Sequence, residues 1–204
     1  MIRILIADDH EIVRDGLKRI LAGTADMEVA AEAAGGDEAL ALVKANDYDV
    51  VMVDMSMPGL SGMDLIKRLR IEKPKLRILV LSMHGEQQYA ARALKAGASG
   101  YLNKDSAAEI LVGAIRKIAA GGVHITEAAA ASLVSAEKAP HEALSDREFE
   151  VLRLLVEGLG PTDIGEKLHL SVKTVSTHKT RILEKLRVNS TAELVRYALD
   201  NKLI

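Results

Sequence analysis

Five side chains suited to phosphoryl chemistry follow short apolar runs in the first part of the 204-residue chain: Asp8, Asp9, Asp54, Ser82 and Lys104. Neighbouring carboxylates repel one another and need a cation or protons. Mg²⁺ suits such a group, because it takes one or two carboxylates together with phosphate oxygens. An unprotonated aspartate beside the cation can attack phosphorus, while lysine and serine can hold other oxygens of the transferred group. The set contains the parts needed for an aspartyl phosphate.

Each of these residues taken alone has a simpler interpretation. An aspartate at a strand end is often only a helix cap, and a single lysine such as Lys104 is usually a solvated surface residue. His10 is expected to be an ordinary first-turn residue, and Met55 and Met57 to be packing or loop residues. Neither GxxxxGK[ST] nor GxGxxG occurs in the sequence, so nucleotide binding is not indicated. The joint placement after four strands favours the functional interpretation.

The elements around these residues predict how the set is assembled. Short apolar runs at residues 2–7, 29–33, 50–53, 78–81 and 100–102 are typical of strands buried on both faces. Helical patterns occur near residues 12–21, 37–45, 63–70, 87–96 and 107–119. This alternation predicts an α/β fold with a doubly wound, five-stranded parallel sheet. With the flavodoxin-like order 2-1-3-4-5, the strands that carry the five residues are neighbours, and their carboxyl ends form the ligand site.

The second part of the chain has a different pattern. We expect residues 1–122 to form the first domain and residues 123–142 a linker, although the first half of that linker could be a sixth helix. Residues 143–204 predict a small all-α domain of four helices. The four helices are predicted to begin at Ser145 with Glu148, at Pro161, at Ser171, and at Ser190 with Glu193.

The long helix after Ser171 combines a buried stripe with a polar outer face. At 100° per residue, Val175, Ile182 and Leu186 form the stripe, with Val172 and Leu183 beside it. The opposite face carries Lys173, Ser176, Thr177, Thr180, Arg181 and Glu184, while His178 and Lys179 lie near the stripe. Residues 167–187 hold six basic residues and one acidic residue, a net +5 in a chain of net charge −2. Such a face suits the major groove of DNA; the alternative is a solvated helix face.

Residues 1–122 resemble the receiver domain of bacterial two-component response regulators. The resemblance rests on residues 8–10, residues 53–59, Ser82 and residues 100–104. It implies that Asp54 is the phosphoacceptor and that Mg²⁺ is held by Asp8, Asp9, Asp54 and the backbone carbonyl of Ser56. It also implies that Ser82 and Tyr101 form a switch pair and that Lys104 binds the phosphate. Asp105 departs from the proline that many receivers have after this lysine.

The second part of the chain resembles the LuxR-type helix-turn-helix. The resemblance rests on residues 144–148, 151–152, 158–159, 164, 168, 170–178 and 185–186. With the receiver-like part, the whole chain resembles a response regulator of the NarL/FixJ family. The resemblance implies base contacts from Ser176, Thr177 and Thr180, and phosphate contacts from Lys173, Lys179 and Arg181. Lys179 would have to extend outward from near the buried stripe. Leu194, Val195 and Ala198 are candidates for a dimer surface, with plain core packing as the alternative.

Three departures from the LuxR-type pattern predict a weakened DNA interaction with an intact fold. Residues 160–162 read Gly-Pro-Thr where relatives usually have a Ser-Asn-Lys-like start, which removes a side-chain cap and a basic phosphate contact. Gly165 stands where alanine is usual, at a cost of about 1 kcal/mol in helix propensity. Thr191 stands where a basic residue is common.

These features together predict a DNA-binding transcription regulator controlled by phosphorylation. The resemblance implies a sensor histidine kinase as partner, double-stranded DNA with two-fold half-sites, and a homodimer in the phosphorylated form. An aspartyl-phosphate hydrolase is the enzyme alternative, but such enzymes carry a second acid where this chain has Ser56. A regulator or adaptor that never uses phosphate is the other alternative. We expect a cytoplasmic protein without membrane contact, because the chain lacks cysteine and any run of 18 apolar residues.

Overall fold

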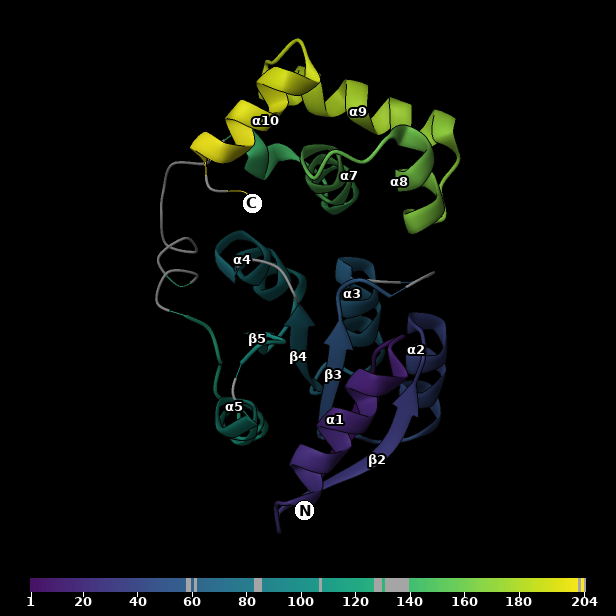
Figure 1. The fold of residues 1–204 in the computed structure, drawn as a ribbon. Coiled ribbons are helices and arrows are strands. Elements are labelled where there is room, and N and C mark those ends of the chain that lie inside the picture. Colours follow the sequence, from purple (N-terminus) through teal and green to yellow (C-terminus); the bar gives the residue numbers. More distant parts are fainter. Residues whose placement is uncertain are drawn as a thin grey trace. The chain divides into compact units, whose positions relative to one another are not determined.

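The computed structural model describes residues 1–57, 60, 62–82, 86–106, 108–126, 130, 140–201 and 203. The chain divides into two compact units, Met1–Leu133 and Val134–Ile204 (Figure 1). Most of the predicted linker, together with Pro58, Gly59 and Ser61, lies outside the described residues. The domain boundaries at residues 122 and 143 therefore stay a prediction.

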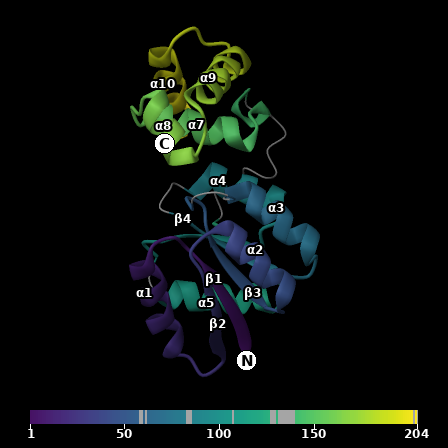
Figure 2. The same ribbon diagram turned by 90° about the vertical axis from the view of Figure 1, so that its right-hand side faces the viewer.

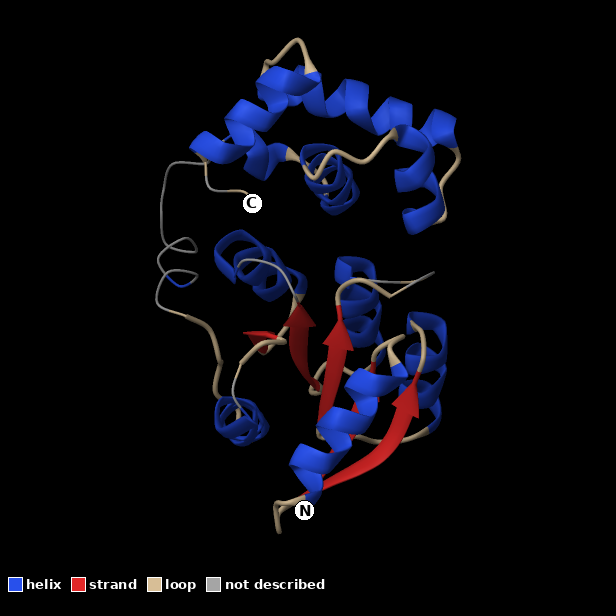
Figure 3. Cartoon of the chain, in the orientation of Figure 1, coloured by secondary structure: helices blue, strands red, loops and turns tan. Residues whose placement is uncertain are grey.

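The first unit is built on a five-stranded parallel sheet of order β2-β1-β3-β4-β5, as predicted (Figure 3). The strands are β1 (Ile2–Ala7), β2 (Met27–Ala33), β3 (Val50–Asp54), β4 (Arg77–Ser82) and β5 (Gly100–Asn103). Every residue of β3 is buried, as expected for a central strand covered on both faces. The order brings the carboxyl ends of β1, β3, β4 and β5 to one edge in succession.

Five helices cover the two faces of this sheet (Figure 2). They are α1 (Glu11–Ala22), α2 (Gly36–Ala45), α3 (Gly62–Glu72), α4 (Glu86–Ala96) and α5 (Ala108–Ala119). Leu21 of α1 and Ile115 of α5 belong to one core cluster with Ile4, Met52 and Leu79 of the strands. Helices α2 and α3 lie against the opposite face (Figure 2). The sheet is thereby held rigidly enough to fix the residues that follow its strands.

The described part of the second unit contains only helices (Figure 3). A short 3₁₀ helix, η1 (Pro140–Ala143), precedes α7 (Asp146–Val156), α8 (Pro161–Leu168), α9 (Val172–Leu186) and α10 (Thr191–Asp200). The four α-helices were predicted, whereas η1 was not. The predicted caps are present: the oxygens Ser145 Oγ, Ser171 Oγ and Ser190 Oγ accept hydrogen bonds from the amides of Glu148, Thr174 and Glu193. At α8, where Gly160 offers no side chain, Asp163 Oδ2 accepts from the Gly160 amide at 3.1 Å.

An ion pair between a buried glutamate and an exposed lysine joins α7 and α9. Glu148 of α7 is 3% exposed, and its Oε2 lies 2.6 Å from Lys185 Nζ of α9. Lys185 Nζ also donates to the Ala143 carbonyl at 3.2 Å. Burial acts to raise the pKa of Glu148, but hydrogen bonds from Lys185 and Ser145 outweigh it and hold the pKa below its usual range. Glu148 therefore both caps α7 and positions α9.

Gly165 permits a close approach between α8 and the turn that follows it. The Leu170 amide donates to the Gly165 carbonyl at 2.8 Å, and a Cβ on Gly165 would lie 2.7 Å from the Leu170 carbonyl oxygen. The low helix propensity expected from the sequence is therefore offset by a steric requirement that the sequence pattern did not reveal.

We predict that Gly165→Ala destabilises the second unit by about 1–3 kcal/mol through overpacking, although alanine favours a helix by about 1 kcal/mol. The contacting atom is a backbone oxygen, which cannot rotate away as a side chain would. Gly113→Ala in α5 is the control, because a Cβ there meets nothing within 4 Å. Thermal unfolding followed by circular dichroism measures both variants; a higher Tm for Gly165→Ala would contradict the steric explanation.

We also predict a pH dependence that comes from Glu148. A carboxyl whose pKa is lower in the folded state stabilises the fold above its unfolded pKa of about 4.3, and this contribution disappears as the pH falls through the folded pKa. The free energy of unfolding of the second unit should therefore fall on acidification below about pH 4.3, and less steeply in Glu148→Gln. Glu166→Gln, which changes an exposed glutamate of α8, should keep the wild-type slope. Equal slopes in all three proteins would show that the Glu148 pair is not responsible.

Candidate functional site

Lys104 joins two buried aspartates at the carboxyl edge of the sheet. Asp8 directly follows β1, Asp54 is the last residue of β3, and Lys104 directly follows β5. Lys104 Nζ lies 2.7 Å from Asp8 Oδ2 and 3.1 Å from Asp54 Oδ1. The two aspartates are only 1% and 2% exposed. The structure thus brings together three residues that are far apart in the sequence.

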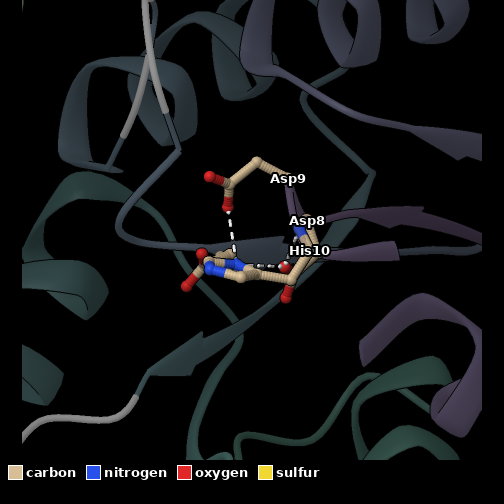
Figure 4. A group of neighbouring side chains, drawn as sticks. Asp8, Asp9 and His10 are labelled. Atoms are coloured by element: carbon tan, nitrogen blue, oxygen red, sulfur yellow. Dashed lines mark hydrogen bonds and ion pairs between the residues drawn. The ribbon is translucent and has the colours of Figure 1, made fainter. Parts of the chain in front are cut away.

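Asp9 and His10 lie beside Asp8 at this site (Figure 4). His10 Nδ1 lies 3.0 Å from Asp9 Oδ1 and 3.3 Å from Asp8 Oδ1, and the His10 amide donates to Asp8 Oδ1 at 2.9 Å. One ligand atom from each of Asp8, Asp9, His10 and Asp54 lies within 4.8 Å of the others. His10 is the N-cap of α1, close to the predicted first turn, but its ring contacts the acids in a way the sequence did not indicate.

The charge balance of the site favours a bound cation. Three carboxylates face one ammonium, an excess of two negative charges when all are ionised. Burial raises the pKa of Asp54, and the neighbouring charge of Asp8 raises it further against the opposing effect of Lys104. Burial acts to lower the pKa of Lys104, but its bond to Asp8 and the charges of both aspartates outweigh this and raise it.

An orphaned oxygen shows where a cation or phosphoryl group fits. Asp54 Oδ2 is buried and has no hydrogen-bond partner among the described residues, and such an atom is costly unless a ligand pairs with it. Carboxylate oxygens are hard ligands of the kind that Mg²⁺ prefers. Asp8, Asp9 and Asp54 therefore fit Mg²⁺.

The predicted switch residues and Ser56 lie close to the aspartates in the fold. Ser82 ends β4 and Tyr101 lies in β5, and both side chains are buried. The Ser82 carbonyl accepts from the Lys104 amide at 2.9 Å, which ties the loop that carries the ammonium to β4. The Ser56 amide hydrogen-bonds to Asp54 and acts to lower its pKa. The roles of the Ser82 hydroxyl, Tyr101 and the Ser56 carbonyl stay predictions.

Helix α9 divides into the two faces expected from its sequence. Val175, Ile182 and Leu186 are buried. The predicted DNA-contacting residues are exposed, except for the half-buried Lys179: Lys173, Ser176, Thr177, Lys179, Thr180 and Arg181. Val172 differs from the prediction, because it lies in the first turn and is 47% exposed. The half-buried His178 has a pKa lowered by burial, consistent with a structural role.

The predicted dimer surface on α10 requires correction. Leu194 and Ala198 are fully buried, because the apolar stripe of α10 closes the core of its own unit, where α10 contacts α7. These two residues follow the alternative interpretation, core packing, and are unavailable to a second chain. Val195 is half-buried. Leu199 of the same helix is instead 59% exposed; it was not among the predicted residues because it lies off the stripe.

Two protein families match the two parts of the chain. Residues 4–116 match the response regulator receiver domain, and residues 142–198 match the bacterial regulatory proteins of the luxR family. The oxygen regulatory protein NreC of Staphylococcus epidermidis is 41% identical over 215 residues, covering 99% of both proteins. The chain belongs to the NarL/FixJ family of response regulators. It is therefore a transcription regulator with a LuxR-type DNA-binding domain, as predicted.

Further relatives of this response regulator cover nearly its whole length. Response regulator UvrY of Escherichia coli K12 is 35% identical over 209 residues, covering all of this chain and 96% of the relative. A solved structure of the RcsB response regulator of Salmonella typhimurium has a TM-score of 0.73 and 30% identity, covering 96% of both chains. A structure of an RcsB–DNA complex matches with a TM-score of 0.61, 30% identity and the same coverage. Within the part of the chain that the structure describes, no helix is both long enough and apolar enough to cross a membrane.

We predict that Mg²⁺ stabilises the first unit of this response regulator through the acidic site. At about ten times its Kd, bound Mg²⁺ should add about 1.4 kcal/mol to the free energy of unfolding. Asp54→Asn should lose most of this gain. Asp47→Asn should keep it, since Asp47 is an exposed surface residue paired with Lys73. Thermal unfolding with and without MgCl₂ measures the effect, and equal gains in all three proteins would place the cation elsewhere.

Proposed function

We propose that a phosphodonor transfers a phosphoryl group to Asp54, and that this favours a homodimer that binds two half-sites of double-stranded DNA. The donor is the phosphorylated histidine of a sensor kinase or a small acyl phosphate. The observation that carries the proposal is the buried Asp54, held by Lys104 Nζ at 3.1 Å with its second oxygen unpaired. A cytoplasmic location follows from the proposed DNA partner.

The residues of the site have distinct parts in the proposed transfer. A carboxylate oxygen of Asp54 forms a bond to phosphorus, while the bond between phosphorus and the donor's leaving group breaks. The ammonium of Lys104 stabilises the ionised nucleophile and then holds a phosphoryl oxygen. Mg²⁺, held by Asp8, Asp9, Asp54 and the Ser56 carbonyl, supplies charge neutralisation when bound. Slow loss of the phosphoryl group to water returns the protein to its starting state.

The proposed switch begins at the ends of β4 and β5. The Ser82 hydroxyl turns to donate to a phosphoryl oxygen, and the buried Tyr101 ring repacks beside it. This changes the surface formed by β4, α4 and β5, and phosphorylation thereby shifts an existing equilibrium between conformations. The support is the burial of both residues on neighbouring strands that end at the site.

The proposed DNA contacts lie on the exposed face of α9. Lys173, Lys179 and Arg181 contact phosphates, and Ser176, Thr177 and Thr180 face the bases. The exposure of this face and the complex of RcsB with DNA support the proposal. Because Gly160 and Thr162 replace a polar cap and a basic residue, binding should be weak. The remaining lysine and arginine contacts to phosphates release counterions, so binding should also fall as the salt concentration rises.

Phosphorylation tests the proposal directly. After incubation with acetyl phosphate and Mg²⁺, the wild-type chain should give a shifted band in a phosphate-affinity gel, and Asp54→Asn should not, because it lacks the nucleophile. Asp47→Asn is the matched control and should shift like the wild type. An electrophoretic DNA-binding assay on the phosphorylated form should then show tighter binding than on the unmodified form. A shifted band in Asp54→Asn, or identical DNA binding by both forms, would contradict the proposal.

A further inference from the structure

The hydroxyl groups on the exposed face of α9 donate their protons to the helix itself. Ser176 Oγ donates to the Val172 carbonyl at 2.9 Å, Thr177 Oγ1 to the Lys173 carbonyl at 2.9 Å, and Thr180 Oγ1 to the Ser176 carbonyl at 3.1 Å. This is the back-bonding that serine and threonine commonly make within helices. The oxygens therefore keep their lone pairs for a ligand, whereas their protons are already used.

Methyl groups share this surface with the lone pairs. Thr177 and Thr180 each carry a γ-methyl, and Val172 adds an exposed isopropyl group in the first helical turn. The N-terminal residues of a recognition helix contact base edges when the helix enters the major groove. We call Val172, Ser176, Thr177 and Thr180 the reading face. It offers hydrogen-bond acceptors and methyl groups.

We propose that the reading face selects A·T base pairs in the major groove. An A·T pair presents the amino group of adenine, which is a donor, and the methyl group of thymine. The first suits the hydroxyl lone pairs, and the second suits the methyl groups. A G·C pair also presents a donor, the amino group of cytosine, and both kinds of pair carry two acceptors, but only the A·T pair carries a methyl group. The methyl groups of the reading face therefore carry the preference, and the hydroxyl lone pairs bind the adenine amino group beside them. This inference rests on the proposed DNA-binding function.

Two exposed cationic donors of α9 flank its three hydroxyl residues, and the half-buried Lys179 lies between Thr177 and Thr180. Lys173 precedes the hydroxyl residues and Arg181 follows them, and both are exposed. Their cationic groups can contact phosphates, or guanine acceptors where they reach a base. The inferred preference therefore applies to the central positions of each half-site, and a G·C pair is compatible only with the ends.

Selection from random duplexes tests this preference. The phosphorylated full-length chain is incubated with a random library, and the bound DNA is sequenced. We expect inverted half-sites with A·T pairs at their central positions. Enriched sites with central G·C pairs would overturn this inference but leave the proposed function intact. If no DNA is enriched, the proposed function fails and this inference fails with it.

Matched variants then test the hydroxyl contacts and the methyl contacts separately. Thr177→Ser keeps the hydroxyl and removes the methyl, whereas Thr177→Val keeps a methyl and removes the hydroxyl; the same pair is made at Thr180. The probes are the selected site, the site with one central thymine replaced by deoxyuridine, and the site with one adenine replaced by purine deoxyriboside. Deoxyuridine lacks the methyl, and purine deoxyriboside lacks the amino group.

The wild-type chain should lose about threefold to tenfold in affinity on each altered probe at the contacted position. The serine variant should be insensitive to the loss of the thymine methyl at one position, and the valine variant to the loss of an adenine amino group. Circular dichroism checks that the variants remain folded. If the serine and valine variants respond to both altered probes as the wild type does, the inference is overturned.

Discussion

The contact of one ammonium with two buried carboxylates is the interaction on which the first unit depends. Lys104 neutralises part of the charge that Asp8 and Asp54 bring into a site they could not otherwise share. Removing one partner from a buried ion pair typically costs about 3–5 kcal/mol, because the remaining charge is left uncompensated. The sheet order is what brings these three side chains together. Lys104 follows β5 and reaches past β4 to the carboxylates at the ends of β3 and β1 in the order β2-β1-β3-β4-β5.

The sequence predicted this arrangement because its strands are buried on both faces. Continuous apolar runs such as residues 50–53 mark strands clearly, and the polar residue that ends each run is then a candidate for the site. Other features depend on side-chain packing that a pattern does not contain. His10 is largely exposed, so its spacing could not show that its ring contacts Asp9. Leu194 and Ala198 are apolar, and both a core and a dimer interface require apolar residues.

The two candidate sites use polar groups in opposite ways. Around Asp54 the polar atoms are buried, an oxygen is left without a partner, and the pKa values are shifted, so the site is prepared for a charged ligand. On α9 the hydroxyls of Ser176, Thr177 and Thr180 are exposed, and each donates to a carbonyl of the helix. The first site gains strong interactions when its ligand arrives. The second gains little from any single contact, which is appropriate for a surface that must distinguish sequences by the sum of several contacts.

Only a limited free energy is available to couple the acidic site around Asp54 to the DNA-binding face of α9. A phosphoryl group adds negative charge to a site that already has three carboxylates against one ammonium, so the response must come from groups that can move toward it. Lys104 is held by two carboxylates, and Ser82 lies at the end of the neighbouring strand, so a new anion competes with the existing bonds of the lysine. Allosteric coupling of this kind usually amounts to about 1–3 kcal/mol. That range corresponds to a change in DNA affinity of about 5- to 150-fold. Such a change can switch a half-site from vacant to occupied only where the unmodified protein binds it weakly. In the proposed scheme, the Gly-Pro-Thr start of α8 serves this requirement, because weak binding by the unmodified protein would let phosphorylation decide whether DNA is occupied.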